Sequence, residues 1–200
     1  MPQPTAPVTP TAFRKVMGLF AAGVTVIAAR EGDEIHGMTA NAVTSVSLDP
    51  LLVLVCVDKR ARMNRFLESA GGFSINILSE DQEALSRYFA GSWKPTSPPE
   101  FRFRLWQGGP RLVGCVGAAG CTIDRAIEAG DHRIVVGRVI ALHEGDPAAR
   151  PLLFYGGRYR QLAEVEVPAP PEEWSNDAVH IYYDEWSGTS LPPPPPGEDS

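Results

Sequence analysis

Apolar residues along the chain follow the spacing of β-strands more often than that of helices. Short apolar runs, and stretches in which apolar and polar residues alternate, are separated by turn residues, which is typical of strands. The pattern predicts the main strands at residues 24–29, 35–46, 51–57, 73–78, 112–126 and 133–142. It also predicts an edge strand at 101–105 and a hairpin in which 152–155 and 158–162 flank Gly156-Gly157.

Helical signals are few and short. Thr11 is a candidate N-cap for a first helix, whose apolar face consists of Phe13, Val16, Met17 and Phe20. A second helix is predicted over 62–69. Ser79, with Gln82 at the capping-box position, predicts a third helix that runs through Phe89. Many strands with few short helices predict a mainly β barrel of Greek-key type and not an alternating β–α fold.

Composition supports a packed domain and excludes several classes of protein. Of the 200 residues 44% are hydrophobic and 21% are charged, which is enough apolar material for one core. The three cysteines lie in apolar runs without a CxxC pair, so we predict packing residues and neither a disulfide framework nor a metal site. No run approaches the roughly 20 apolar residues that span a bilayer, and the N-terminus lacks the pattern of a signal peptide. We therefore expect a cytoplasmic protein that does not enter a membrane.

Charge is distributed unevenly along the chain. Residues 1–163 hold all 18 Lys and Arg and 15 acidic residues, whereas residues 164–200 hold nine acidic residues and no Lys or Arg. The body is too weakly basic to predict nucleic-acid binding. We predict three parts: a disordered extension at 1–10, a domain at 11–163 and an acidic, Pro-rich tail at 164–200. The tail is either a strap on the body or a segment that binds a partner.

The segment 37–50 is unusually rich in small polar side chains between two apolar strands. Thr39, Asn41, Thr44, Ser45 and Ser47 offer uncharged donors and acceptors, and they leave the backbone approachable. Such a segment suits the rim of a flat heterocycle that has carbonyl and ring-nitrogen edges. A solvated polar turn explains the same residues equally well.

A basic segment follows the next strand. Lys59, Arg60, Arg62 and Arg65 lie at the start of the helix predicted at 62–69. Cations beside a helix start can hold a phosphate, although a solvated basic helix face is the simpler explanation. Further along the chain, Gly130-Asp131-His132 precedes a strand. His132 either donates a hydrogen bond to a ligand or caps a turn.

Taken in order, several blocks of sequence resemble the flavin reductase-like family, the reductase components of two-component flavin monooxygenases. They cover residues 13 to 162, and include 20–27, 37–41, 45–50, 52–57, 73–79, Asp81-Gln82, Phe89-Ala90, 130–132 and 151–160. The resemblance implies an FMN-binding split barrel. The sequence lacks a GxGxxG motif between strand and helix, a P-loop and a nucleophile elbow, so other nucleotide sites and a hydrolase triad are not indicated.

The resemblance also implies which residues surround each ligand. The flavin ring and its phosphate side are expected against Thr39, Ala40, Asn41, Ser45, Val46, Ser47, Cys56, Val57, Asp58, Lys59, Arg60, Met63 and Phe89. The nicotinamide is expected near His132, Tyr155, Arg158 and Tyr159. No side chain is expected to act as a catalytic acid, base or nucleophile, because hydride passes directly between stacked rings.

The implied activity is reduction of FMN or FAD by NADH or NADPH, with the reduced flavin passed to a partner monooxygenase. The resemblance also implies a homodimer. Two alternatives remain open at this point: another flavoenzyme on the same barrel, such as an oxidase or a direct reductase of an organic substrate, or a non-catalytic module that binds flavin or haem.

Overall fold

A computed structural model of the protein describes residues 8–163. The predictions made for most of the N-terminal extension and for the tail at 164–200 lie outside these residues. The described part of the chain is mainly β with short helices, as the pattern of apolar residues predicts.

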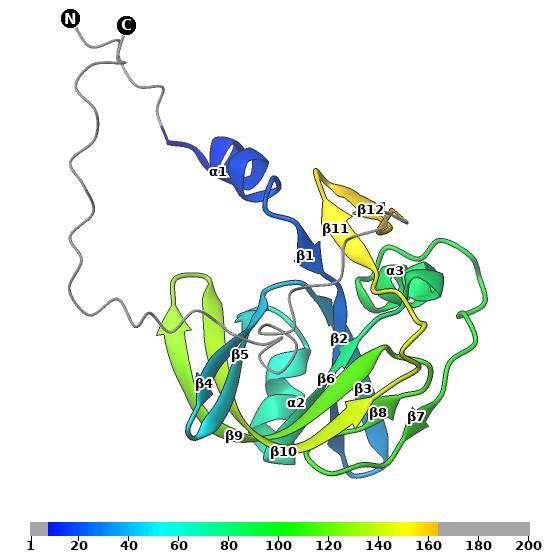
Figure 1. The fold of residues 1–200 in the computed structure, drawn as a ribbon. Helices are drawn as coiled ribbons and strands as arrows, with labels where there is room; N and C mark the ends of the chain where they lie inside the picture. Colours follow the sequence, from blue (N-terminus) through cyan, green and yellow to red (C-terminus); the bar gives the residue numbers. More distant parts are fainter. Residues whose placement is uncertain (1–7, 164–200) are drawn as a thin grey trace, which may run out of the picture. The chain divides into compact units, whose positions relative to one another are not determined.

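One seven-stranded antiparallel sheet forms most of the structure, in the order β3-β2-β6-β9-β10-β5-β4 (Figure 1). The strands are β2 (Thr25–Glu31), β3 (Glu34–Ala40), β4 (Val43–Leu48), β5 (Leu51–Asp58), β6 (Gly72–Ile77), β9 (Gly117–Ala129) and β10 (His132–Glu144). The prediction of one strand over 35–46 is wrong. The chain leaves the ladder at Asn41 and Ala42, so that β3 and β4 form the two opposite edges of the sheet.

Two small ribbons accompany the large sheet. β1 (Ala22–Gly23), β11 (Leu153–Tyr155) and β12 (Arg158–Arg160) form one, and the predicted hairpin is present as β11 and β12. Gly156 and Gly157 make its turn with φ of +60° and +76°, a conformation that glycine adopts without steric cost. The second ribbon pairs β7 (Phe103–Arg104) with β8 (Arg111–Leu112), so the edge strand predicted at 101–105 is only two residues long.

The helices are close to their predicted positions. α1 (Pro10–Met17) is capped by Thr9, whose hydroxyl accepts from the amide of Ala12, and not by Thr11. This correction has a simple reason, since Pro10 is best accommodated in the first turn, where no N–H is needed. α2 is Met63–Ala70. A short 3-10 turn, η1 (Glu80–Gln82), leads into α3 (Glu83–Phe89), and the predicted capping box at Ser79 is present.

The main core fills the concave side of the curved sheet, where α2 lies (Figure 1). Phe66 and Met63 of α2 are fully buried against Val55 and Phe73 from the strands. A second, smaller cluster joins Val24 and Val26 to α3 and β8. The two clusters fix the edges of the sheet and the loops that carry the polar segment.

A buried polar network crosses this second region. Asn76 is fully buried, and its Nδ2 donates to the carbonyl of Val26 at 3.0 Å and to the hydroxyl of Ser74 at 2.9 Å. Its Oδ1 accepts from the amide of Leu112 at 2.8 Å. The amide group thus fastens β8 to β2 and β6 with its polar atoms paired, as a buried amide requires.

β4 carries an irregularity in its pairing with β5. Ser45 pairs with Val53, but Ser47 pairs with the adjacent residue, Leu52. Val46 is therefore the extra residue of a β-bulge. The bulge lies within the polar segment singled out from the sequence.

Candidate functional site

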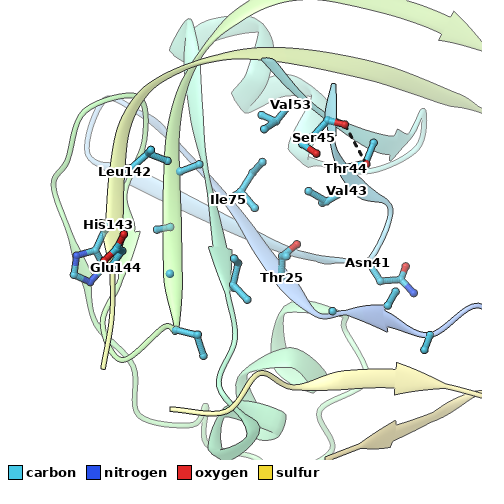
Figure 2. Close-up of a pocket in the computed structure, with 18 of the residues that line it drawn as sticks. Thr25, Asn41, Val43, Thr44, Ser45, Val53, Ile75, Leu142, His143 and Glu144 are labelled. Atoms are coloured by element: carbon cyan, nitrogen blue, oxygen red, sulfur yellow. Dashed lines mark hydrogen bonds between the residues drawn. The ribbon is translucent and has the colours of Figure 1, made fainter. Parts of the chain in front are cut away.

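A cavity of about 770 Å³ opens on the concave side of the sheet (Figure 2). Its walls are mostly apolar and come from the segment after α1 and from β4, β5, β6, β9 and β10; they include Phe20, Val43, Val53, Ile75, Ile77, Val116 and Leu142. The volume falls within the range of roughly 300–1,000 Å³ that small-molecule sites occupy. An apolar slot of this size can accept a flat heterocycle.

A few polar groups stand among the apolar walls. Asn41 lies at one end of the cavity, His143 and Glu144 lie at the other, and Thr25 and Ile75 lie between them (Figure 2). The side chains of Asn41 and Ser45 hydrogen-bond to none of the described residues. A ring edge with carbonyl and nitrogen atoms would find both donors and acceptors here.

The other residues of the polar segment have different surroundings. Thr39 donates from its hydroxyl to the carbonyl of Ser86 in α3 at 2.7 Å. Ala40 packs against the main core. Val46 is 42% exposed and Ser47 is half-buried, and neither lines the cavity. The structure thus brings only Asn41 and Ser45 of the predicted flavin-ring residues to the cavity wall.

The predicted phosphate residues lie next to the break at Asn41, because the amide of Cys56 donates to the carbonyl of Ala42 at 3.0 Å. Lys59 Nζ is 2.6 Å from Glu128 Oε2. Arg60 binds both oxygens of Asp58, and these bonds hold the pKa of the Asp58 carboxyl well below its usual range. Both cations therefore stand on the surface, each beside one carboxylate.

Two other predicted contacts of this region are internal. The side chains of Val57 and Met63 are fully buried in the main core. Neither residue has any surface that a ligand could contact in the described part of the chain. The sequence could not separate them from their exposed neighbours, because an apolar residue at a strand end fits either position.

His132 is brought to the same end of the sheet as Asp58, since the two residues pair across β10 and β5. Its Nδ1 lies 2.8 Å from Asp131 Oδ1, and this bond lowers the pKa of the Asp131 carboxyl. The cavity-lining residue of β5 is Val53, five residues from Asp58. At ~3.3 Å per residue, His132 and the cations lie roughly 16 Å along the strand from the cavity wall.

The C-terminal hairpin and Phe89 form a third group around α3. Tyr159 bonds through its hydroxyl to the Ser86 hydroxyl at 2.8 Å, while Tyr155 and Arg158 are exposed. Phe89 packs against Phe101 and Phe103 and covers Gly37, where a side chain would collide with its ring. Phe89 is thus held in an aromatic cluster away from the cavity lining.

Sequence reasoning missed several cavity residues. His143 and Glu144 close one end of the cavity, and burial, with Arg111 and Arg104 nearby, lowers the pKa of His143. The sequence pattern places Phe20 on the face of the first helix, but α1 ends at Met17 and Phe20 lines the cavity instead. The pattern predicts Leu142 only as part of a strand. Their positions depend on which strands neighbour each other, so no local sequence signal marks them.

The three cysteines lie inside or at the edge of the packed interior. Cys115 and Cys121 are buried, and burial raises the pKa of the Cys121 thiol to about 12; Cys56 is half-buried. Among residues 8–163, no cluster of His, Cys and acidic side chains is arranged to hold a metal ion. No helix in that part of the chain is long and apolar enough to cross a membrane.

Comparisons with known proteins agree on one family. Residues 17–163 match the family described as "Flavin reductase like domain". The chain is 44% identical over 170 residues to an NADH-dependent flavin reductase from Rhodococcus sp, covering 84% of this chain and 93% of that protein. It is 41% identical over 151 residues to the reductase component of 4-hydroxyphenylacetate 3-monooxygenase from Thermus thermophilus, covering 76% and 95%.

Solved structures give the same result. An NADH:FAD oxidoreductase from Streptomyces globisporus, in complex with NAD and FAD fragments, superposes with a TM-score of 0.72 at 38% identity and covers 82% of this chain and 100% of that one. The flavin reductase of styrene monooxygenase from Pseudomonas putida S12 superposes with a TM-score of 0.67 at 33% identity, covering 76% and 97%.

Proposed function

The chain belongs to the flavin reductase-like family, and from this premise we propose that it reduces a flavin, FMN or FAD, with electrons from NADH or NADPH. Relatives named NADH-dependent flavin, FAD and FMN reductases support this activity. The observation that carries the proposal is an apolar slot at whose rim stand the side chains of Asn41 and Ser45, which hydrogen-bond to none of the residues that the structure describes. Both residues lie inside the region that matches the family.

The side chains of the cavity have a positioning role in this proposal. When bound, the flavin supplies the chemistry by accepting the hydride of the dihydronicotinamide. The apolar walls exclude water from the reacting rings, and Asn41 and Ser45 hold the polar ring edge by hydrogen bonds. Alignment of two reactants can lower a barrier by roughly 7–11 kcal/mol, so the reaction needs no acid, base or nucleophile from the protein.

We further propose that Lys59 and Arg60 hold the flavin phosphate. Lys59 has three N–H donors and Arg60 has five, and each is engaged by a single carboxylate group in the described residues. Their segment adjoins the polar segment through the bond between Cys56 and Ala42. A flavin that is held at the ring edge by Asn41 can therefore extend its phosphate toward them.

Spectrophotometry tests the activity directly. Purified protein with NADH and excess FMN or FAD should consume NADH over many turnovers, and NADPH should be compared in parallel. Replacing both Lys59 and Arg60 with Ala should raise the KM for FMN and leave that for riboflavin, which lacks the phosphate, unchanged. A protein that retains one equivalent of flavin and shows no turnover would contradict the proposed function.

We also propose that the protein works as a homodimer. Every residue of α1 is solvent-exposed, including Phe13 at 60% and Val16 at 65%, and the apolar residues continue at Leu19 and Phe20. Phe20 also lines the cavity. A second copy would cover this amphipathic helix face, since large exposed apolar patches mark interaction surfaces.

Sedimentation equilibrium checks the assembly. The wild-type protein should sediment at about twice the 21.6 kDa chain mass. Replacing Phe13 and Val16 by Ser should shift it toward the monomer, whereas Arg14→Ser on the same helix should not. A wild-type protein that is monomeric at micromolar concentration would contradict the dimer.

The reduced flavin is proposed to serve a partner monooxygenase. Two relatives are named as reductase parts of such enzymes, for 4-hydroxyphenylacetate and as subunit HsaB of a flavin-dependent monooxygenase. Because the electron donor is a cytoplasmic metabolite, we place the protein in the cytoplasm. Addition of a candidate oxygenase should couple NADH consumption to hydroxylation of its substrate.

A further inference from the structure

The two-stranded ribbon of β7 and β8 has one apolar face and one cationic face. Phe103 and Leu112 pair across the ribbon and pack into the second core cluster. Arg104 and Arg111 form the next pair of partners. Because side chains alternate between the two faces of a strand, both arginines point away from that cluster. Directly opposed residues have Cβ atoms about 4.5–5.5 Å apart, so the two positive charges are close neighbours.

The side chain of His143 lies on the face of the large sheet that this ribbon covers. Asn76, Ala118 and His143 are partners in one row across β6, β9 and β10, so their side chains share one face. The side chain of Asn76 accepts a hydrogen bond from the amide of Leu112. The shared face is therefore the one on which β8 lies.

His143 and the two arginines are close enough to interact. Burial and the positive charges of Arg111 and Arg104 lower the pKa of His143. Leu142 and Glu144 alternate with His143 along β10, and they face the cavity on the other side of the sheet (Figure 2). Three groups that can carry positive charge thus meet on the outer face, behind one end of the cavity.

No described carboxylate neutralises these three groups, which we call the outer cation cluster. Neither Arg104 nor Arg111 forms an ion pair with a carboxylate of residues 8–163. Arg104 is exposed, and Arg111 is half-buried beside the thiol of Cys115, whose pKa is raised by burial and lowered in part by Arg111. Like charges directly opposite each other in a ladder are destabilising. An anion bound between them would remove this cost.

We propose that the outer cation cluster binds a phosphate group on the outer face of the sheet. The guanidinium fork of each arginine binds phosphate oxygens in pairs, and protonated His143 adds a further N–H donor. The strand β10 separates this site from the cavity, so the proposal does not depend on flavin reduction. The phosphate group belongs either to a free ion or to a nucleotide, and the two sources are separated by the probes used.

Calorimetry in a phosphate-free buffer of low ionic strength tests the site with inorganic phosphate and with AMP. Arg104→Gln should raise the dissociation constant of the phosphate group roughly tenfold, as expected when charge-assisted hydrogen bonds are lost. Arg111→Lys keeps the charge without the fork and should raise it less. The difference between wild type and Arg104→Gln isolates this site from the one proposed at Lys59 and Arg60.

The matched control is Arg14→Gln, which removes one exposed arginine of α1 and should leave phosphate binding unchanged. Binding of AMP that is tighter than that of phosphate and is weakened by Arg104→Gln would assign the site to a nucleotide. Equal affinities would assign it to the free ion. Equal weakening by Arg104→Gln and Arg14→Gln would mean that net charge alone acts, and it would overturn the site.

Stability and the titration of His143 give two readouts that a merely structural role of Arg104 would not produce. Without phosphate, Arg104→Gln should raise Tm slightly, because it removes the repulsion. Phosphate should raise Tm of the wild type and have little effect on the variant. In the wild type it should also raise the pKa of His143, followed by NMR of the ring, because an anion favours the charged imidazole. An unchanged pKa of His143 at saturating phosphate would overturn the proposal.

Discussion

Two asparagines of this protein have the same functional group and opposite surroundings. Asn76 is fully buried, and its amide makes three hydrogen bonds that join β2, β6 and β8. Asn41 lies at the rim of the cavity, and its amide bonds to none of the described residues. A polar side chain that is fully satisfied inside the fold has little left for a ligand, whereas one that the fold leaves unsatisfied at a cavity rim is available.

The contrast extends to the neighbours of each asparagine. Ser74 shares the network of Asn76 and is fully buried, while Ser45 lines the same cavity as Asn41. An unpaired polar group has a free-energy cost only where water cannot reach it. The rim residues therefore stay unpaired at little cost until a ligand displaces the water.

The largest expected effect is on stability, at Asn76. Asn76→Ala removes the partner of the Leu112 amide and of the Val26 carbonyl, so it should cost about 3 kcal/mol and lower Tm by roughly 10 °C. Thermal unfolding followed by circular dichroism measures the shift. A Tm within about 2 °C of the wild-type value would show that the network is not needed for stability.

Asn41 and Ser45 at the cavity rim should show the opposite behaviour, a loss of flavin binding without a loss of stability. Asn41→Ala with Ser45→Ala should raise the KM for flavin about tenfold, as the loss of two hydrogen bonds implies, and leave kcat and Tm nearly unchanged. Ser69→Ala, at an exposed serine of α2, is the control for loss of a surface hydroxyl. If the Asn41→Ala/Ser45→Ala variant has a lower Tm and an unchanged KM for flavin, Asn41 contributes to stability as Asn76 does and the contrast between the two asparagines is wrong.

A smaller effect on the free energy of unfolding is expected for the hydrogen bond between Ser86 and Tyr159. The hydroxyls of Ser86 and Tyr159 join α3 to the hairpin. Ser86→Ala and Tyr159→Phe each remove this bond, so their effects on the free energy of unfolding should not add. Their double-mutant cycle should give a coupling of about 1 kcal/mol. Strictly additive effects would place the two side chains apart in solution.

The smallest effect concerns an exposed pair. Arg65 hydrogen-bonds Glu31 and holds the pKa of that carboxyl below its usual value. A lowered pKa in the folded state gives a stabilising contribution that is present above the unfolded pKa and is lost as pH falls through the folded value. Glu31→Gln should therefore lower Tm slightly at pH 7 and not at pH 3. A Tm difference that is independent of pH would exclude this pair as its origin.

Local patterns were sufficient to predict much of the fold. The hairpin turn at Gly156-Gly157, the capping box at Ser79 and most strands follow from spacing and turn chemistry and are present, whereas the segments 35–46 and 112–126, each predicted as one strand, form two strands each. The break at Asn41 could not be predicted, because nothing in the alternation of residues 35–46 marks a change of partner strand. Strand propensity is a property of one segment, whereas the break at Asn41 depends on which other strands β3 and β4 pair with at the two edges of the sheet.

The site could be predicted only in part for the same reason. Asn41 and Ser45 stood out as small polar residues between apolar strands. The bond from Ser86 to Tyr159 and the ion pair from Lys59 to Glu128 join residues that are 73 and 69 positions apart in the chain. Such contacts follow from strand order, and no periodicity in the sequence encodes that order.

The bulge at Val46 means that the number of residues in the polar segment 37–50 matters to the site as much as their identity. Side chains alternate between the two faces of a strand, and the extra residue shifts that alternation by one step between Ser45 and Ser47. Deleting Val46 would keep every polar residue of the segment and restore a regular ladder with β5. It would also remove the bend and the extra twist that a bulge gives its strand, so that the polar side chains before and after position 46 would be presented at a different angle to each other. Evolution can exchange residues in this segment more freely than it can add or remove one.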